Sequence, residues 1–300
     1  YKFKKNYKSK NDKNIKRKIF HLLKLIKHSK KPLIVVGNGI HVAEAEDGFL
    51  KFHKKIKIPI ISSWNASDLI NTNDKFYIGR MGLFGDRASN FAAQSCDLLI
   101  VFASKLSIPQ TGYDTKSFAK NAKKIIIDID KHELNKNAFS NIKLKINYDI
   151  KDFFYEINKV IKNKKISFKF SKWRDVTLGW KNKYPVFNKI KRSSGNFINS
   201  FHLMEELSKA CKGDETIVTD MGTSFTCTMQ ALKIKNHKKQ RLFTSSGLAA
   251  MGFGLPGAIG ASFANKNKQI ICITGDGGLM FNIQELQTIK HYNLPIKIFV

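Results

Sequence analysis

Four consecutive residues, Gly275-Asp276-Gly277-Gly278, have the types and order expected of a site that binds a metal ion and a diphosphate. The apolar run over 269–274 before them is typical of a buried strand, and apolar residues recur with helical spacing over 281–289. A carboxylate at a strand end is a hard oxygen ligand for a divalent cation. Glycine amides and a helix start suit a bound diphosphate. Because Asp-Gly pairs are common in plain turns, the prediction depends on the flanking strand and helix.

A second segment rich in glycine and other small residues lies upstream, at 245–260. Small residues let the backbone approach a ligand or a neighbouring helix closely. Together the two segments resemble the thiamine diphosphate enzymes of the acetolactate synthase type. Residues 245–260 are similar to that family's Gly-Leu-Gly-x-Met-Gly-Phe-Gly-Leu-Pro-x-Ala-Ile-Gly signature, and 275–295 resemble its Gly-Asp-Gly motif for diphosphate and magnesium.

The resemblance implies roles for single residues around the two segments. Asp276 matches the first magnesium ligand, and Gly277 and Gly278 match positions that meet the diphosphate. Met251 matches the bulky residue that holds the cofactor in its bent conformation, and the backbone of Ala249 and Met251 would bond its pyrimidine ring. The alternatives are a turn or helix-capping role for Asp276 and a core position for Met251.

Gly222, Thr223 and Ser224 stand where acetolactate synthases usually have Gly-Gln-His. Hydroxyl groups can still donate to a phosphate, so all three residues are predicted to bind the cofactor. The Gly-Thr-Ser form resembles decarboxylase-type relatives. It therefore leaves open a different 2-oxo acid decarboxylase or carboligase, including one that serves sugar biosynthesis.

The central domain of this family can carry FAD, and six residues of this chain fall in the matching loops: Gly37, Gly39, Gly82, Gly85, Lys105 and Asp128. An Asp at a strand end suits a ribose hydroxyl. However, Phe84 stands where the synthase has His, and Lys105 stands where it has Arg. A glycine-rich loop alone is weak evidence for a nucleotide. Both a flavin-binding and a flavin-free central domain stay open.

Continuous apolar runs that alternate with helical patterns predict parallel strands covered on both faces. The predicted fold is two doubly wound α/β domains with mainly parallel sheets. The resemblance implies that they are part of a three-domain enzyme. We expect a Lys-rich helical lead-in over 1–30, a central domain over 31–162, a linker over 163–196 and a C-terminally incomplete diphosphate-binding domain over 197–300. Trp173 and Trp180 are expected to anchor the linker on a domain surface.

Composition predicts a cytoplasmic protein without a membrane span. Four scattered cysteines lack metal-type spacing and are expected to be reduced: Cys96, Cys211, Cys227 and Cys272. The formal net charge of +30 is compatible with nucleic-acid binding. Yet the lysines are spread along the chain without a recognition motif, which predicts a solvated surface and no nucleic-acid partner.

The resemblance implies decarboxylation of a 2-oxo acid, usually pyruvate, with carboligation to a second carbonyl compound, in a homodimer or tetramer. In this family the reaction requires thiamine diphosphate and Mg²⁺. The family's catalytic Glu belongs to an N-terminal domain, and its second metal ligand, an Asn, is expected just beyond Val300. Residues 1–300 are therefore expected to be inactive without the remaining parts of such an enzyme. The remaining alternatives are a catalytically inactive relative that acts as an interaction subunit and a basic nucleic-acid-binding protein.

Overall fold

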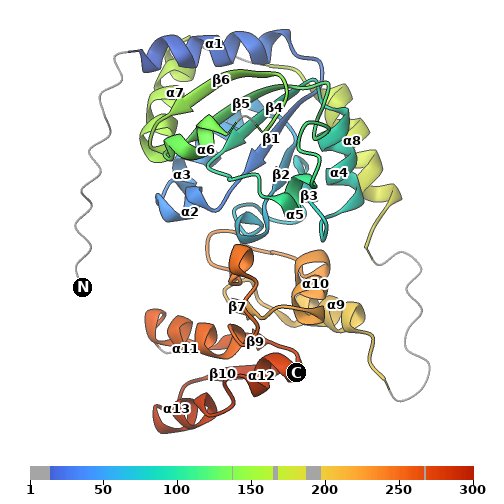
Figure 1. Ribbon diagram of the computed structural model, residues 1–300, viewed down its shortest axis with the longest axis vertical. Helices are drawn as coiled ribbons and strands as arrows, with labels where there is room; N and C mark the ends of the chain where they lie inside the picture. The colour runs from blue at the N-terminus through green and yellow to red at the C-terminus, as the bar shows by residue number, and fades with distance from the viewer. Residues whose placement is uncertain (1–13, 137, 165–167, 187–196, 267) are drawn as a thin grey trace.

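A computed structural model describes residues 14–136, 138–164, 168–186, 197–266 and 268–300 (Figure 1). Residues 1–13 of the expected lead-in, and 165–167 and 187–196 of the expected linker, lie outside the described residues. The described chain forms two units, each built on one parallel sheet with helices on both faces. This arrangement confirms the predicted pair of doubly wound α/β domains.

The central domain has a six-stranded parallel sheet in the order β3-β2-β1-β4-β5-β6. Its strands are β1 (Pro32–Val36), β2 (Ile60–Ser62), β3 (Tyr77–Arg80), β4 (Leu98–Phe102), β5 (Lys123–Asp128) and β6 (Ile142–Asn147). This is the order of dinucleotide-binding folds, with the switch point between β1 and β4. Every residue of β1 and β4 is buried, which explains their uninterrupted apolar sequences.

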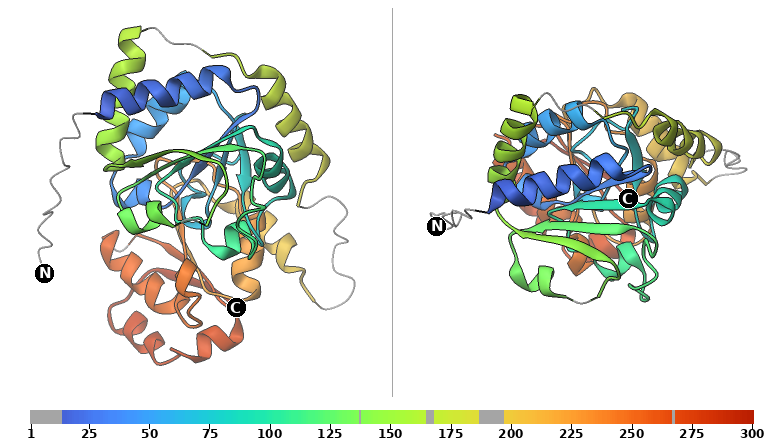
Figure 2. Two further views of the ribbon diagram at one scale, coloured as in Figure 1. Left: turned by 45° about the horizontal axis from the view of Figure 1, so that its top comes forward. Right: turned by 90° about the horizontal axis from the view of Figure 1, so that it is seen from above.

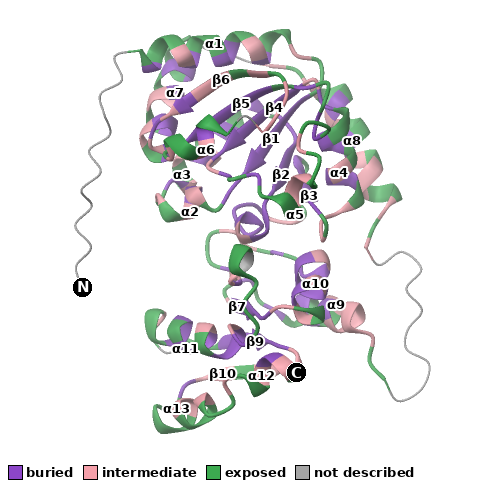
Figure 3. Cartoon of the chain, viewed as in Figure 1, coloured by how far each residue is buried: buried purple, intermediate pink, exposed green. Residues whose placement is uncertain are grey.

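The helices of the central domain pack in two layers. One core cluster includes residues of α1 (Ile15–His28), α3 (Glu46–Ile56) and α7 (Ile150–Lys164), and the other includes residues of α4 (Arg87–Ser95) and α8 (Ser171–Lys183). The shorter elements are α2 (Gly39–Val42), η1 (Trp64–Ala66), α5 (Ile108–Thr111) and α6 (Lys131–Asn135). Figure 3 shows that the buried residues follow the sheet and the inward faces of the helices.

Helix α8 lies in the segment between the two sheets and packs on the central domain. The Trp173 side chain is buried, and its indole nitrogen donates a hydrogen bond to the Pro32 carbonyl at 2.9 Å. The Trp180 ring stands edge-on to the Trp173 ring, with the ring centres 5.7 Å apart. This part of the chain is therefore attached to the central domain.

The C-terminal domain has a four-stranded parallel sheet in the order β10-β9-β7-β8. Its strands are β7 (Thr216–Thr219), β8 (Arg241–Phe243), β9 (Ile270–Ile273) and β10 (Ile296–Phe299). Its helices are α9 (Ser200–Ala210), α10 (Thr223–Ala231), η2 (Ser246–Leu248), α11 (Gly254–Ala264), α12 (Asp276–Met280) and α13 (Glu285–His291). Figures 1 and 2 show this domain at one end of the central domain.

None of the helices in the described part of the chain combines the length and the apolar character that a membrane span requires.

Candidate functional site

Three loops meet at the carboxyl edge of the C-terminal sheet. They follow β7, β8 and β9 and cover residues 220–222, 244–253 and 274–275. From β7 the chain passes to β8 on one side, and then returns to β9 on the other side of β7. The sheet therefore has its switch point between β7 and β9, where ligands of open α/β sheets bind.

Asp220 ties the three loops together. Its carboxylate is 1% exposed and accepts hydrogen bonds from the Gly252 amide at 3.0 Å and the Gly254 amide at 3.1 Å. The Thr274 hydroxyl donates to the same carboxylate at 3.1 Å, and the Met221 amide donates at 2.7 Å. Asp220 follows β7 directly, as Thr274 follows β9. Sequence reasoning missed Asp220; the signal was an Asp directly after an apolar strand.

Two glycines allow this close packing. A Cβ on Gly278 would lie 2.6 Å from Asp220 Oδ2, so a side chain there would displace the carboxylate. Gly252 has a φ of +87°, and a Cβ on it would lie 2.7 Å from Asn282 Nδ2. Helix α12 thus packs against Asp220 in the loop after β7, and the residues just after α12 pack against the loop after β8.

The predicted metal ligand begins helix α12. The Asp276 side chain is exposed, and its Oδ1 accepts a hydrogen bond from the Gly277 amide at 2.8 Å. A Cβ on Gly277 would lie 3.5 Å from Met251 Cε. The structure therefore brings Asp276, Gly277, Gly278 and Met251 to one place.

Helix α10 begins beside the same switch point. Its N-cap, Gly222, has a φ of +81°, a conformation that favours glycine. Thr223 is exposed, and the Ser224 hydroxyl donates to the Met221 carbonyl at 3.0 Å. Of the two predicted hydroxyl donors, Ser224 thus already has an acceptor within the chain.

The loop between β8 and α11 carries Ala249 and Met251. Ala249 has a φ of +52° and is exposed. The Met251 side chain is 57% exposed, unlike a methionine of the core. Met251 lies beside Gly277 at the start of α12.

The chemistry and the space at these loops fit a cation with a diphosphate. An added Cβ on Gly222 or Gly275 would meet no atom within 4 Å, so open space lies in front of both helix starts. Asp276 supplies an exposed carboxylate, a ligand type that Mg²⁺ accepts. By contrast, burial raises the pKa of the Cys272 thiol beneath the site to about 12, so this thiol stays protonated and takes no part in thiolate chemistry.

A largely apolar cavity of about 380 Å³ opens beside Gly222 and Thr223. Phe84 of the central domain contributes to its lining, together with residues of α9 and α10. The rings of Phe84, Trp64 and Phe225 contact one another across the domain junction, with centres 4.9–6.0 Å apart. The cavity therefore lies between the two domains and next to the predicted diphosphate site.

The predicted flavin loops of the central domain contact each other instead of enclosing a space. The Gly37 amide donates to the Phe102 carbonyl at 2.9 Å, and the Gly39 amide donates to the Ala103 carbonyl at 3.2 Å. A Cβ on Gly37 would lie 2.0 Å from the Ala103 carbonyl oxygen. These two amides are thus used within the chain at the switch point where a nucleotide phosphate would need them.

The second flavin loop is likewise closed by the chain. The Gly82 amide donates to Asn90 Oδ1 at 2.9 Å, and a Cβ on Gly82 would lie 2.4 Å from the Pro109 carbonyl oxygen. The Gly85 amide donates to the Gly82 carbonyl at 3.0 Å. The loop is therefore built on internal contacts and has no room for a side chain at Gly82 or Gly85.

The two charged residues predicted for the flavin lie in separate surroundings. Lys105 is exposed, and its Nζ is 4.0 Å from Glu133 Oε1. Asp128 is buried and accepts a hydrogen bond from the Asp130 amide at 2.9 Å, and burial raises the pKa of its carboxyl group. In this structure the six predicted residues do not form a cradle for a flavin diphosphate.

Two domain families match the chain. Residues 19–157 match the central domain of thiamine pyrophosphate enzymes, and residues 220–300 match their C-terminal TPP binding domain. Thiamine pyrophosphate is another name for thiamine diphosphate. The second match includes the loops after β7, β8 and β9.

Similar curated proteins are large subunits of acetolactate synthase. The chain is 31% identical to the subunit of Porphyra purpurea over 95% of its own length, and 34% identical to a probable one of Methanococcus aeolicus, also over 95%. It is 31% identical to the isozyme 2 large subunit of Escherichia coli K12 over 91%. The chain spans about half the length of these relatives, 47–48%. It belongs, as its sequence predicted, to the thiamine pyrophosphate enzymes, of which it carries the central and the C-terminal TPP-binding domains.

Proposed function

We propose that this protein decarboxylates a 2-oxo acid, with pyruvate as the first candidate, and joins the product to a second carbonyl compound. The main support is that Asp276, Gly277, Gly278 and Met251 lie together at the switch point of the sheet, in a domain that matches the TPP-binding domain family. Similarity to acetolactate synthase large subunits supports the same reaction class. Bound thiamine diphosphate would supply the carbanion chemistry, and the protein would supply placement and electrostatics.

We propose Asp276 as a Mg²⁺ ligand and the starts of α10 and α12 as the place of the diphosphate. A carboxylate suits Mg²⁺, and the backbone amides at helix starts suit an anion. Gly277 and Gly278 would present amides, and Thr223 would present its hydroxyl. Ser224 is the weaker hydroxyl donor, because it already donates to Met221.

We propose that Met251 holds the cofactor in its bent conformation, and that the backbone of Ala249 and Met251 bonds the pyrimidine ring. The exposure of Met251 and its position beside Gly277 support this role. The apolar cavity beside Gly222 and Phe84 gives a small 2-oxo acid room next to the diphosphate site. Apolar walls also exclude water from reactive species.

A second candidate is another 2-oxo acid decarboxylase or carboligase of the same superfamily. The observation that favours it is the start of α10, where Thr223 and Ser224 replace the Gln-His of acetolactate synthases. A catalytically inactive relative that serves as an interaction subunit is the remaining alternative. Product analysis separates the three.

We propose a central domain that works without a flavin. The internal hydrogen bonds of Gly37, Gly39 and Gly82 support this choice between the two alternatives that the sequence left open. The purified protein is expected to show no flavin absorbance and no rise in melting temperature with added FAD. Stoichiometric flavin in the purified protein would contradict the proposal.

We propose a homodimer or tetramer located in the cytoplasm. Large apolar side chains near the cofactor loops are exposed, including Leu248, Met280 and Phe281, and exposed apolar patches often mark protein interfaces. The four cysteines are free and buried, as expected in a reducing compartment. A nucleic acid is not among the proposed partners.

The direct test of function is turnover by the full-length protein. Pyruvate is supplied with thiamine diphosphate and Mg²⁺, and carbon dioxide and the carboligation product are measured. We expect both products to form and to depend on the cofactor. Cofactor-dependent release of carbon dioxide without carboligation would favour the simple decarboxylase, and binding without turnover would favour the inactive relative.

A further inference from the structure

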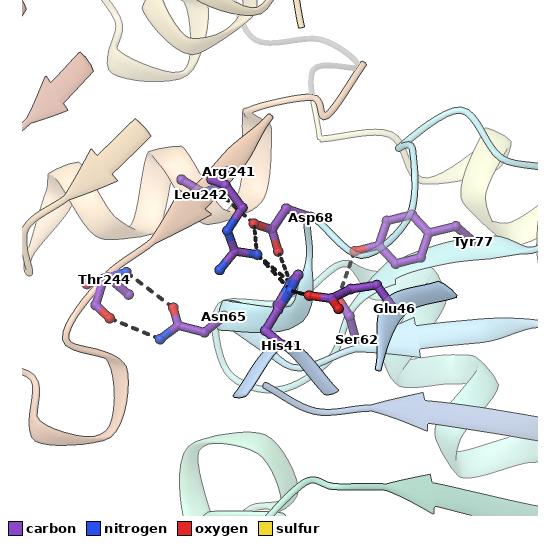
Figure 4. Close-up of polar contacts among 9 residues, drawn as sticks. All are labelled: His41, Glu46, Ser62, Asn65, Asp68, Tyr77, Arg241, Leu242 and Thr244. Carbon is purple, nitrogen blue, oxygen red and sulfur yellow. Dashed lines mark hydrogen bonds and ion pairs between the residues drawn. The ribbon is translucent and has the colours of Figure 1, made fainter. Parts of the chain in front are cut away.

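The edge strand of the C-terminal sheet is held by polar side chains of the central domain. Among the described residues, β8 lies at the edge of the sheet beside β7, so every second backbone group of β8 points away from the sheet. Figure 4 shows Asn65 and Asp68 approaching this side of β8 from the central domain. The two residues lie in and just after η1, which follows β2.

The hydrogen bonds alternate along β8. The Arg241 amide donates to the Glu215 carbonyl at 3.0 Å, on the side of β7. The Leu242 amide, in a buried residue, donates in the other direction, to Asp68 Oδ2 at 2.9 Å. A buried amide without an acceptor is costly, so Asp68 supplies what a further strand would otherwise supply.

Asn65 forms a reciprocal pair of hydrogen bonds with Thr244, the residue directly after β8. The Thr244 amide donates to Asn65 Oδ1 at 3.2 Å, and Asn65 Nδ2 donates to the Thr244 carbonyl at 3.0 Å. A single side chain thus fixes both backbone groups of Thr244. The next residue begins the segment 245–251, which carries Ala249 and Met251 and is called the cofactor loop below.

The Asp68 carboxylate is itself held in place on both sides. It has no exposed surface and lies 2.8 Å from His41 Nε2, while His41 Nδ1 is 2.8 Å from Glu46 Oε1 (Figure 4). From the C-terminal domain, Arg241 NH1 lies 2.8 Å from Asp68 Oδ2. A buried carboxylate that keeps a cationic partner and a backbone donor is fixed in orientation.

The loop that carries Met251 is therefore fastened at both ends. Asn65 and Asp68 hold Leu242 and Thr244 before it, and Asp220 holds the Gly252 amide after it. Within the loop, the Ser245 hydroxyl oxygen accepts from the Ala250 amide at 3.2 Å, and residues 247–251 are exposed. The position of Met251 thus depends on contacts within its own domain and on contacts from the central domain.

We propose that Asn65 and Asp68 are positioning residues for the thiamine diphosphate site, which act through β8 on the loop at 245–251. The expected effect on catalysis rests on the proposed function. That Asn65 and Asp68 hold the loop follows from the hydrogen bonds alone. Small displacements of a group that orients a reactant cost much activity. The central domain would then contribute to catalysis by fixing the geometry of its neighbour.

Asn71 provides a matched control. Its side chain also belongs to the central domain and accepts a hydrogen bond from a C-terminal-domain amide, that of His237, at 2.7 Å. His237 lies before β8, at the end remote from the cofactor loop. Asn71→Ala and Asn65→Ala therefore remove the same group from the same domain junction, but only Asn65→Ala releases Thr244.

The test compares both variants with the full-length wild type by hydrogen exchange without cofactor and by calorimetry with thiamine diphosphate and Mg²⁺. We expect Asn65→Ala to speed amide exchange over 244–252 and to weaken cofactor binding roughly tenfold, the scale of one lost hydrogen-bonded fastening. Asn71→Ala should lower the melting temperature but leave exchange over 244–252 and the cofactor affinity as in the wild type.

The proposal is overturned if Asn65→Ala matches Asn71→Ala in both the exchange over 244–252 and the cofactor affinity. A wild type that binds no thiamine diphosphate would refute the proposed function, while the exchange data would still decide whether Asn65 fastens the loop. If Asn65→Ala does not fold, Asn65→Asp keeps an acceptor for the Thr244 amide and replaces the donor to the Thr244 carbonyl with a carboxylate oxygen. Faster exchange over 244–252 in Asn65→Asp than in Asn71→Ala is then the supporting result, and equal exchange the contrary one.

Discussion

At the scale of single residues, Asp220 organises the proposed cofactor site without being one of its predicted ligands. Its buried carboxylate gathers donors from the loops after β7, β8 and β9. Gly278 is a glycine for the same reason, because a side chain there would collide with Asp220 Oδ2. The glycines of the Gly275-Asp276-Gly277-Gly278 motif therefore differ in what they do.

The difference between these glycines gives a prediction with an internal control. A Cβ on Gly278 would lie 2.6 Å from Asp220 Oδ2, whereas a Cβ on Gly275 would meet no atom within 4 Å. Gly278→Ala should lower the free energy of unfolding by about 1–3 kcal/mol through overpacking. Gly275→Ala should change it by less than about 0.5 kcal/mol. Chemical denaturation of both variants measures the two values, and equal effects would refute the role given to Asp220.

At the scale of elements, much of the fold was predictable from the sequence. The apolar runs over Pro32–Val36 and Leu98–Phe102 predict strands buried on both faces, and both are fully buried centre strands. The contacts of Asp68 and Asn65 with β8 were not predictable, since they join segments 174 and 179 residues apart. The periodicity of a single sequence does not predict hydrogen bonds between residues so far apart.

Glycine-rich loops show the same limit at the candidate site. Gly37 and Gly39 occupy the loop where a nucleotide fold places its phosphate, and the sequence alone left a flavin open. In the structure both amides donate to the neighbouring β4 segment. A glycine can be required because a ligand approaches the backbone or because another loop does. The sequence looks the same in both cases. Only tertiary contacts separate them.

The contact of α8 with β3 predicts a pH dependence of stability. Lys181 Nζ donates to the Thr72 and Tyr77 carbonyls at 2.7 and 2.6 Å, and burial lowers the pKa of Lys181 from 10.5 to about 8. Between pH 8 and 10.5 the unfolded chain therefore holds a proton on Lys181 that the folded chain has lost. Stability from this group rises with pH across that window and is lower below it.

Lys181→Met tests this prediction. The free energy of unfolding of the wild type should rise more steeply from pH 8 to 10 than that of the variant. Denaturation at several pH values measures both slopes. Identical slopes would show that Lys181 keeps an ordinary pKa in the folded protein.

At the scale of the whole molecule, residues of both domains surround the proposed site. The central domain supplies Asn65 and Asp68 to the edge of β8 and Phe84 to the apolar cavity, and the C-terminal domain supplies the proposed cofactor ligands. A central domain that binds no flavin would therefore still be needed, because it would hold β8 of the C-terminal domain in position.

We propose above that Asp276 holds the metal of a thiamine diphosphate site. Isothermal calorimetry of the full-length protein with thiamine diphosphate and Mg²⁺ tests it most directly on Asp276→Ala, with Asp214→Ala as control. Asp214 is also an exposed acid of the C-terminal domain, but it precedes β7 at the opposite edge of the sheet. We predict that Asp276→Ala weakens cofactor binding by on the order of 100-fold, whereas Asp214→Ala binds as the wild type does. Unchanged affinity in Asp276→Ala would contradict the account.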